Sequence, residues 1–526
     1  MFKPQPLGVG MVYFPALEPF FDGHGGLLDV LEVEPQTLWL RSTAALDPAS
    51  DPPEPRSAHR LDERAFAALA RWRQAKLLHG VGMPLASSVP SDPRQHPPWR
   101  DSIARLQPHW VSEHLAFQRV PQPRLAQTQG ATDVHGGFLL PACQVDETVS
   151  LAVHRIAQLQ HLSGRPVAFE TSPNYLRRDR TQLDDGTFYA QVAVRANCGI
   201  LLDLHNLWCN ERNGRQSMQE VMARLPLERV WEVHLAGGEA RDGYWLDAHS
   251  GLVPDELMDF CARWLPKLVN LGALVYEVIP DYVQARGMSH EALADQLCAL
   301  QGLWRHRDRV FVAGGIRTEP VQLPDRLDPA AAPGHNANAP YSEGPAPADR
   351  APGHLATSPP PVLTSAQWEQ ALGALVNGRH APNTPRVLVD DPGIEVLRTL
   401  VESFRVGTLT AGLTLSWRLL VLRIGEGATA QLMKDFWRNH WPEPFAFDEL
   451  CSFARFTQAR LDAGELDVPH LGSVMAYELG VARAQQTGQE IWTRFDCDPV
   501  PLLSALARGQ SPGPLVSGSF ELRAGP

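Results

Sequence analysis

CGILLDLHN, residues 198–206, is the stretch that decides the fold: an uninterrupted apolar run ends on Asp203 and passes straight into a polar segment. The same pattern recurs in RPVAFETSP (165–173), which ends its apolar run on Glu170, and in RVWEVHLAGG (229–238), where the polar side chain is His234. Near-continuous apolar runs are typical of strands buried on both faces of a parallel sheet, and barrel enzymes carry their chemistry at the carboxyl ends of such strands. The three stretches therefore predict strands of one α/β barrel.

The first 318 residues contain seven apolar runs of this kind. They are LLDVLEVEP, KLLHGVGM, WVSEHLAF, RPVAFETSP, CGILLDLHN, RVWEVHLAGG and ALVYEVIP. Helical patterns lie between them, at 62–78, 146–162, 217–225, 255–270 and 289–304. This alternation predicts a TIM-type (β/α)₈ barrel over 1–318. The eighth strand is either LGVGMV at the start or RVFVAGG near residue 310.

A change in composition predicts where the barrel ends. Residues 319–363 are dominated by Pro, Ala, Gly and Asp and read as a flexible linker. From 364 to 526 the patterns favour helices at 365–376, 392–403, 408–423, 447–463 and 470–487, followed by short strands in IWTRFD and SGSFELRA. We expect a smaller, mostly helical (α+β) domain there, whose simplest reading is a binding or scaffolding module.

Composition also limits the partners and the compartment. The formal net charge of -12 argues against nonspecific nucleic-acid binding, which needs a basic surface. The seven cysteines are scattered and form no CxxC pair, as is usual in a reducing compartment. The N-terminus lacks a signal-peptide pattern, and no run of about 18 apolar residues occurs. We therefore expect a cytoplasmic protein without membrane or nucleic-acid partners.

Side chains able to bind metals stand at the ends of six successive predicted strands. They are His79, His114, Glu170, Asp203, His234 and Glu277. One such residue would be unremarkable, but six in register are hard to explain as accident. Two local clusters add to them: Asn206 follows Asp203 by three residues, and YWLDAHSG holds the pair Asp247 and His249, whose spacing points both groups to one side of an extended segment.

The ligand types limit the metal. Imidazole and carboxylate without thiolate favour iron, manganese or zinc over copper(I) or an iron–sulfur cluster. Nine candidate ligands exceed the four that a tetrahedral zinc needs. Two or three six-coordinate ions that share a bridging carboxylate would use all nine and leave positions open for water, oxygen or substrate. The number of ligands thus predicts a multinuclear site.

The order and spacing of these motifs resemble the multinuclear non-haem iron-dependent oxidase family. The resemblance covers roughly residues 5 to 315 and rests on HGVG, SEHLAF, FETSPNY, LLDLHN, EVHLAGG, LDAHSG and the strand that ends in Glu277. It implies that His79, His114, Glu170, Asp203, Asn206, His234, Asp247, His249 and Glu277 are the metal ligands, with Glu170 as the bridge. Thr171 stands where the family commonly has Asn, which puts substrate contacts near Glu170 in doubt.

The resemblance further implies the reaction. Members of the family modify ribosomally made precursor peptides, most often at cysteine, with two or three irons in mixed Fe(II)/Fe(III) states and O₂ as co-substrate. An open ferric position would bind the substrate thiolate, and a neighbouring ferrous ion would activate dioxygen for hydrogen abstraction from the cysteine β-carbon. The protein would supply geometry and redox tuning.

The second domain resembles, over VPHLGSVMAYELGVARA and the segment after it, the partner proteins that accompany these oxidases and help to recognise the peptide. Enzyme and partner would then be fused, and the linker would hold the partner at high effective concentration.

Several further polar residues flank the nine. His205, Glu32, Glu34, Glu113 and Glu232 are expected to support the ligands or to be solvated charges at strand edges. Asp133 and His135, in TDVHGG, either line the mouth of the site or belong to a structural loop.

Two other classes of function stay open. One is a divalent-metal barrel isomerase or endonuclease-like hydrolase, which Fe(II)-dependent oxygen consumption would separate from an oxidase. The other is a non-catalytic peptide-binding scaffold, against which the presence of all nine ligand-type residues argues.

Overall fold

The computed structural model describes residues 2–41, 59–122, 133–285, 287–313, 363–382 and 384–525. The linker predicted at 319–363 lies outside the described residues, apart from its last residue. Within the described ranges, no helix has the length and apolar character needed to cross a membrane.

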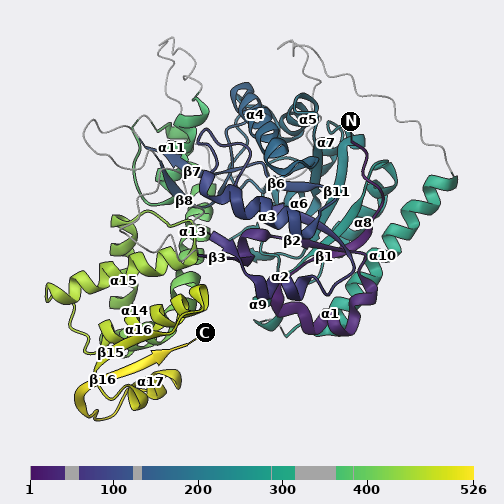
Figure 1. The fold of residues 1–526 in the computed structure, drawn as a ribbon. Coiled ribbons are helices and arrows are strands. Elements are labelled where there is room, and N and C mark those ends of the chain that lie inside the picture. The colour runs from purple at the N-terminus through teal and green to yellow at the C-terminus, as the bar shows by residue number, and fades with distance from the viewer. Residues whose placement is uncertain are drawn as a thin grey trace, which may run out of the picture.

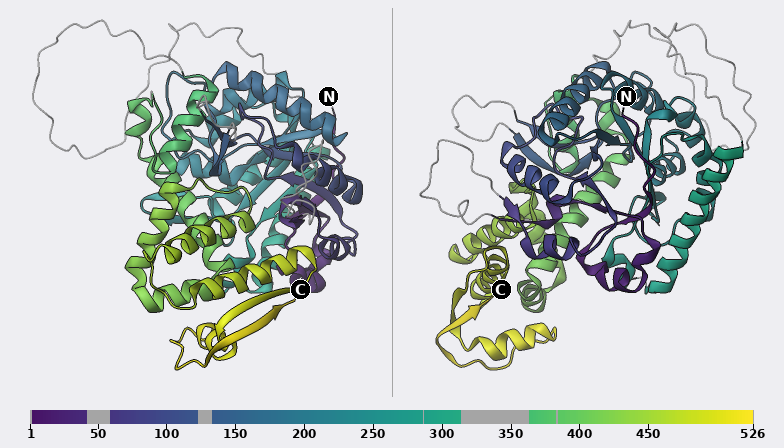
Figure 2. Two further views of the ribbon diagram at one scale, coloured as in Figure 1. Left: turned by 60° about the vertical axis from the view of Figure 1, so that its left-hand side comes forward. Right: turned by 45° about the vertical axis from the view of Figure 1, so that its right-hand side comes forward.

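Eight parallel strands close into a barrel, in the spatial order β1-β14-β11-β10-β9-β6-β5-β2 (Figure 1). Their bounds are β1 Gly8–Val12, β2 Val30–Val33, β5 Ala75–Gly80, β6 Val111–His114, β9 Val167–Glu170, β10 Gly199–Asp203, β11 Val230–Ala236 and β14 Ala273–Glu277. The right-hand view of Figure 2 shows helices around the outside of the strands. The predicted TIM-type barrel is confirmed.

The helices of the barrel region surround these strands. They are α1 Glu18–His24, α2 Glu63–Leu69, α3 His96–Leu106, α4 Asp146–Ser163, α5 Asp185–Arg195, α6 Leu204–Arg212, α7 Met218–Met222, α8 Asp255–Trp264, α9 Pro280–Ala285 and α10 His290–Ala313. Local chemistry sets several of their ends. Asp62 caps α2 by accepting from the backbone N–H of Arg64, and α4 stops at Gly164, whose φ of 59° is left-handed.

The structure decides one alternative that the sequence left open and corrects one prediction. The eighth strand is LGVGMV: β1 pairs with β14 and β2, whereas residue 310 lies within α10. The helix predicted at 62–78 ends at Leu69, because residues from Ala75 onward pair with β2 as strand β5. In both places pairing within the sheet overrides a local pattern that fits either structure.

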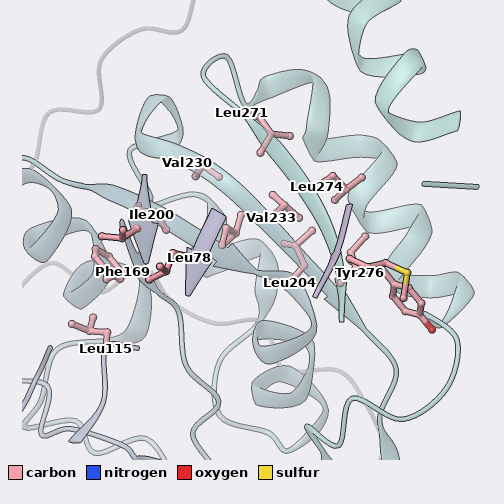
Figure 3. Close-up of a cluster of buried hydrophobic side chains, with 14 of the residues drawn as sticks. Leu78, Leu115, Phe169, Ile200, Leu204, Val230, Val233, Leu271, Leu274 and Tyr276 are labelled. Atoms are coloured by element: carbon pink, nitrogen blue, oxygen red, sulfur yellow. The ribbon is translucent and has the colours of Figure 1, made fainter. Parts of the chain in front are cut away.

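The apolar side chains form an inner and an outer layer. The inner cluster consists of Val12, Val30, Leu77, Trp110, Ala168, Leu201, Trp231, Ala273 and Val275. Leu77 stands two residues before His79, and Leu201 two before Asp203, so the period of two places the polar residues on the same inner side, above the apolar floor. The alternate residues, such as Leu78, join the larger cluster that packs strands against helices (Figure 3).

Three antiparallel hairpins lie among the barrel elements: β3 Trp39–Arg41 with β4 His59–Leu61, β7 Phe117–Pro121 with β8 Asp133–Leu140, and β12 Glu239–Arg241 with β13 Tyr244–Leu246. The last two directly follow β6 and β11 and therefore extend the end of the barrel at which the polar side chains gather. The sequence reading did not predict these hairpins.

The described residues from 363 to 525, the C-terminal region, are mostly helical. Its elements are α11 Ser365–Val376, α12 Arg386–Val389, α13 Gly393–Gly412, α14 Thr414–Asn439, α15 Ala446–Asp462, α16 Leu471–Thr487, β15 Ile491–Cys497, α17 Pro499–Ala507 and β16 Ser517–Ala524. The helix predicted at 408–423 is wrong in its start, because α13 continues to Gly412. Glu478 accepts from the backbone N–H groups of Leu415 and Ser416 and so supports the beginning of α14.

The C-terminal region packs against the barrel through α11–α13. Apolar residues of these helices, among them Trp368, Leu372 and Ile394, form one buried cluster with Phe117 of β7 and Tyr175 of the loop after β9. Helices α14–α17 have a separate core of their own. In Figure 1, α13 lies between the barrel and α14–α16, and α11 lies near β7 and β8. The boundary predicted at 364 thus divides segments that share a core.

Candidate metal centre

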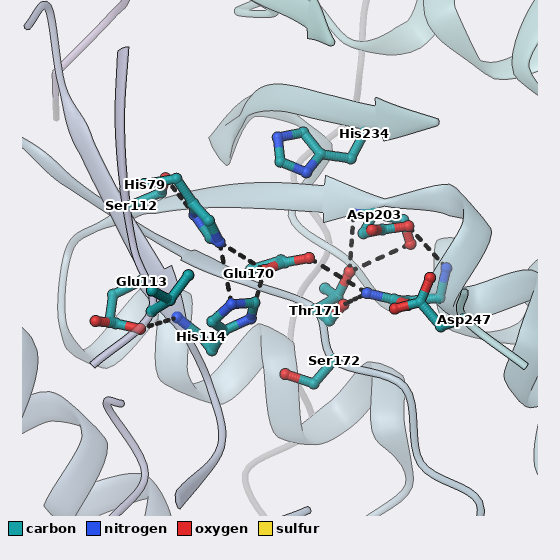
Figure 4. Close-up of polar contacts among 12 residues, drawn as sticks. His79, Ser112, Glu113, His114, Glu170, Thr171, Ser172, Asp203, His234 and Asp247 are labelled. Carbon is teal, nitrogen blue, oxygen red and sulfur yellow. Dashed lines mark hydrogen bonds and ion pairs between the residues drawn. The ribbon is translucent and has the colours of Figure 1, made fainter. Parts of the chain in front are cut away.

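The fold brings all nine candidate ligands to the carboxyl-terminal end of the barrel. His79, His114, Glu170, Asp203, His234 and Glu277 come from β5, β6, β9, β10, β11 and β14, Asn206 from the first turn of α6, and Asp247 and His249 from the segment after β13. Figure 4 shows side chains of this group converging from several strands.

The first group, here called the strand half, consists of His79, His114 and Glu170. Glu170 Oε2 lies 2.6 Å from His114 Nδ1 and 3.2 Å from His79 Nε2, and the two imidazoles approach to 3.1 Å. Ser112 Oγ lies 2.9 Å from His79 Nδ1, which leaves the Nε2 of that ring directed at Glu170. The carboxylate thus faces two imidazole nitrogens, a geometry that one cation could occupy.

The centre of the site continues from the other oxygen of Glu170. Asn206 Nδ2 donates to Glu170 Oε1 at 3.2 Å, and the backbone N–H of Asn206 donates to Asp203 Oδ1 at 2.7 Å. Ligand atoms of Glu170, Asp203, His234 and Glu277 all lie within 4.8 Å of one another. Glu170 therefore belongs to two adjoining groups.

His234 is held between two carboxylates. Its Nδ1 lies 3.1 Å from Glu277 Oε1, and its Nε2 lies 3.1 Å from Glu32 Oε1 and 3.6 Å from Glu232 Oε1. The indole N–H of Trp110 donates to Glu232 Oε2 at 2.8 Å. All five side chains are buried, so Glu32 and Glu232 are not solvated charges but supports of the imidazole.

The loop half consists of Asp247, His249 and Glu277, the first two of which follow β13 outside regular structure. His249 Nε2 lies 3.1 Å from Asp247 Oδ1 and 3.2 Å from Glu277 Oε2. Asp247 Oδ1 also lies 2.9 Å from His205 Nδ1, and the indole N–H of Trp245 donates to His205 Nε2 at 3.2 Å. His205 thus supports Asp247, as predicted for a group behind the ligands.

Unpartnered buried atoms test whether this arrangement fits metal ions. Among the side chains of the described residues, Asp203 Oδ2 and Asn206 Oδ1 are buried with no hydrogen bond or ion pair. Five further buried atoms have ion-pair contacts but no hydrogen bond of good geometry: Glu170 Oε2, His234 Nδ1 and Nε2, His249 Nε2 and Glu277 Oε2. Buried polar atoms are normally paired, so a concentration of orphans at one place requires an explanation. All of them are oxygen or imidazole nitrogen, the donors that iron, manganese and zinc accept. The residues fit a multinuclear metal centre.

The electrostatics support the same reading. Burial raises the pKa of Asp203 well above its usual value, and the charges of Glu170 and Glu277 raise it further. Burial also opposes ionisation of Glu170, but His114 and His79 outweigh it and hold the pKa of that carboxyl well below its usual value. Each ion pair that Glu170, Asp247 or Glu277 makes in the described structure is with a histidine. Bound cations would relieve this buried negative charge.

The remaining predicted residues have structural partners. Glu113 is buried and accepts from the backbone N–H of Met83 at 2.8 Å, while Glu34 lies half-buried after β2. Asp133 pairs with Arg119 across the β7–β8 hairpin, and His135 Nδ1 accepts from the backbone N–H of Gly137. Asp133 and His135 therefore belong to a structural hairpin.

The sequence reading missed two residues that hold the ligands in place. Thr171 Oγ1 accepts from the backbone N–H of Asp203 at 3.0 Å, so this departure from the family pattern has a structural use. Tyr175 Oη accepts from the backbone N–H of Asp247 at 3.0 Å. The only signal for Tyr175 was its place in FETSPNY, five residues after Glu170.

Part of the barrel is similar to a described protein family. Residues 57–292 match the family model described as "RiPP precursor modification enzyme MbnB/TglH/ChrH". This segment contains all nine candidate ligands.

Curated relatives include UPF0276 proteins from several bacteria. That of Anaeromyxobacter sp. (strain Fw109-5) is 29% identical over 245 residues, which cover 45% of this chain and 83% of the relative. The protein of Bordetella pertussis is 32% identical over 206 residues, which cover 37% of this chain and 66% of the relative. The protein of Chromobacterium violaceum is 30% identical over 183 residues, which cover 35% of this chain and 62% of the relative. The matches to these last two span less than two thirds of their lengths.

Solved structures of two sugar epimerases align with more than half of this chain. D-allulose 3-epimerase from Methylomonas sp. aligns with 58% of this chain and 100% of its own, at 13% identity and a TM-score of 0.35. The 3-keto-D-glucoside 4-epimerase YcjR of E. coli aligns with 57% of this chain and 99% of its own, at 12% identity and a TM-score of 0.33.

Proposed function

We propose that this chain is a multinuclear iron- and O₂-dependent oxidase that modifies a ribosomally made precursor peptide at cysteine, with the C-terminal region helping to recognise the peptide. One observation carries the proposal: Glu170 is shared by two adjoining clusters of ligand atoms, one of which contains Asp203, whose Oδ2 is buried and unpartnered. A shared carboxylate suits a bridge between ions, and the match to the peptide-modification family supports the substrate class.

Contacts among the ligands support up to three positions for iron. His79, His114 and Glu170 would hold the first ion, and Glu170 with Asp203, His234 and Glu277 would hold the second. Asp247, His249 and Glu277 would hold a third, and Asn206, which contacts Glu170 and Asp203, would support the second. Iron bound there would supply redox chemistry with dioxygen, which none of these side chains performs alone.

The chain itself orients these groups and keeps water from them. Ser112 and Glu32 each contact the ring nitrogen of a histidine on the side away from its neighbouring carboxylate, which sets the tautomer of His79 and the orientation of His234. The least buried side chains of the two halves are those of His114, 16% exposed, and His249, 27% exposed. We expect a substrate thiol to approach the site past His114 and His249, where the ligands are most exposed.

The C-terminal region offers a surface for an extended peptide. Its β15–β16 sheet has two strands, and most residues of β16 are exposed. An extended peptide adds readily to such a free strand edge. Trp492, 61% exposed on β15, would add apolar contact.

The test is anaerobic loading of the purified chain with Fe(II), followed by exposure to O₂ with a cysteine-containing peptide encoded beside it. We expect two or three ions per chain, oxygen consumption that depends on the peptide, and a change in peptide mass. Asp203→Ala should lose iron and the mass change but keep its fold. Turnover without oxygen consumption would move the assignment to an isomerase or hydrolase, and a folded chain that binds no iron would reject an iron-dependent function.

A further inference from the structure

Helix α13 of the C-terminal region begins directly on the loop that follows Glu170. A Cβ placed on Gly393, the first residue of α13, would stand 2.2 Å from the carbonyl oxygen of Tyr175 and 3.0 Å from the Cα of Leu176. Asp391 Oδ2 accepts from the backbone N–H of Arg177 at 2.9 Å. Because these contacts involve backbone atoms, the start of α13 and residues 175–177 form one closely packed unit.

The side chain of Tyr175 extends from this unit to the candidate metal centre and contacts it through its hydroxyl. Tyr175 is 5% exposed, and its hydroxyl accepts from the backbone N–H of Asp247 at 3.0 Å. Leu246, the residue before Asp247, is packed in the apolar cluster that contains Tyr175 and Ile394 of α13. A single side chain therefore spans from the C-terminal region to a candidate ligand.

Among the described residues, the backbone of Asp247 makes one hydrogen bond, from its N–H to Tyr175. Asp247 lies after β13 in a segment without regular secondary structure, and His249 adopts a left-handed φ of 46°, which is uncommon for a residue other than glycine. The carbonyl of His249 accepts from the backbone N–H of Ile279, and the side chain of Asp247 contacts His205 and His249. The contact with Tyr175 is therefore one of several that set the position of this ligand, and it is the one that leads to α13.

We propose that helix α13 positions Asp247 through Tyr175, so that docking of the C-terminal region completes the loop half of the metal centre. The inference rests on the proposed function, because it assumes that Asp247 binds a metal ion. Tyr175 and Gly393 are positioning residues. The strand half has no such dependence on α13, since His79, His114 and Glu170 lie on barrel strands.

Two glycines of α13 give a matched pair of variants in the full-length chain. Gly393→Ala places a methyl group against the Tyr175 carbonyl and forces the helix start to retreat, whereas Gly407→Ala, in the same helix, meets open space. Anaerobic Fe(II) titration would measure the number of ions bound and the dissociation constant of each. We expect Gly393→Ala to bind the loop-half ion about 10- to 100-fold more weakly, as for lost outer contacts at other metal sites, with the strand-half ion and the Gly407→Ala control unchanged.

Tyr175→Phe provides a second variant that does not disturb packing. It keeps the buried ring and removes only the acceptor of the Asp247 N–H, so it should reproduce the selective weakening without lowering the melting temperature by more than about 2–4 °C. Iron binding is read out here without any turnover.

The outcomes separate the two hypotheses. Selective weakening in both variants supports the coupling. Unchanged iron binding in Gly393→Ala and Tyr175→Phe, or an equal loss from both halves in Tyr175→Phe, overturns it while leaving the metal centre intact in the unaltered chain. Absence of iron binding in the unaltered chain would reject the proposed function and this inference together.

Discussion

The two halves of the candidate centre are built by different means. Glu170 and His79 of the strand half are each 3% exposed at the side chain and sit in a closed sheet, where neighbouring strands hold the backbone. In the loop half, Asp247 is 13% exposed and His249 27%, and both follow β13 outside the sheet. Both halves use imidazole and carboxylate ligands, but the support of the ligands differs. Sheet pairing positions the strand half and Glu277, whereas contacts from other side chains help to position Asp247 and His249.

Removing the residue that joins the centre of the site to the strand half should have the largest effect. We expect Glu170→Gln to keep the shape of the side chain but to lose the charge that faces His114 and His79, and with it most bound iron and more than about 100-fold of activity, since even outer-shell losses cost about 10- to 100-fold. Iron content and peptide modification would be measured beside Asp242→Asn, an exposed control. Retention of all ions would show that Glu170 is no bridge.

Removing a support of the loop half should act on that half alone. In His205→Phe the ring still packs near Trp208, but Asp247 Oδ1 and the Trp245 N–H lose their partner. We expect about 10- to 100-fold weaker iron binding at the loop half only, measured by Fe(II) titration. His154→Phe, on the exposed face of α4, is the control. Equal weakening at both halves would contradict the comparison.

Removal of metal from the unaltered chain should proceed in two steps. Because the loop half is more exposed and less braced, we expect a chromogenic chelator to withdraw one ion several-fold faster than the rest, as local opening is easiest where backbone support is weakest. Absorbance over time would resolve the phases, and the fast phase should become faster still in His205→Phe. A single phase would mean that the two halves open together.

The smallest expected effect is the pH dependence of stability that comes from the contact between Glu369 and Ser88. Glu369 of α11 is buried and accepts from the backbone N–H and hydroxyl of Ser88; burial raises its pKa to about 7, although those hydrogen bonds and Arg155 lower it. A raised carboxyl pKa means that the folded state binds the proton more tightly than the unfolded state does. This contribution to stability is present below pH 4.5 and is lost as the pH rises through 7.

Glu369→Gln should therefore remove part of that pH dependence. We expect the variant and the unaltered chain to melt alike at pH 5, and the variant to melt about 1–3 °C higher at pH 8.5, measured by calorimetry. Iron binding at the loop half should not follow this change, because Glu369 is not in contact with Tyr175 or Gly393. A loop-half affinity that falls in parallel would place the coupling in α11 instead of α13.

The barrel strands and the position of the candidate ligands could be predicted from the sequence alone. The apolar runs before Glu170, Asp203 and Glu277 predicted strands, and the position of these residues at the strand ends predicted that they gather at the carboxyl-terminal end of the barrel. The choice of LGVGMV as the eighth strand could not be made, since that run and RVFVAGG are equally apolar. Only pairing with β14 and β2 separates them.

The supports of the site were harder to foresee than the ligands. Tyr175, Thr171 and Ser112 act on residues up to 72 positions away in the chain, and nothing in their immediate neighbours signals that contact. The packing of α13 on residues 175–177 links segments more than 200 residues apart. Local patterns report local geometry, and contacts of this kind depend on where the loops are brought by the whole fold.

The sequence by itself determined the barrel and the nine residues that face one another at its carboxyl-terminal end, because strand periodicity and strand order are written in neighbouring residues. The tertiary structure alone decided how those residues are held. Glu170 lies between two clusters and His234 between carboxylates. The backbone of Asp247 donates to Tyr175, whose own backbone packs against α13. The reason is physical, since a side chain's type is local, whereas its position to a fraction of an ångström is set by packing among segments that are distant in the chain.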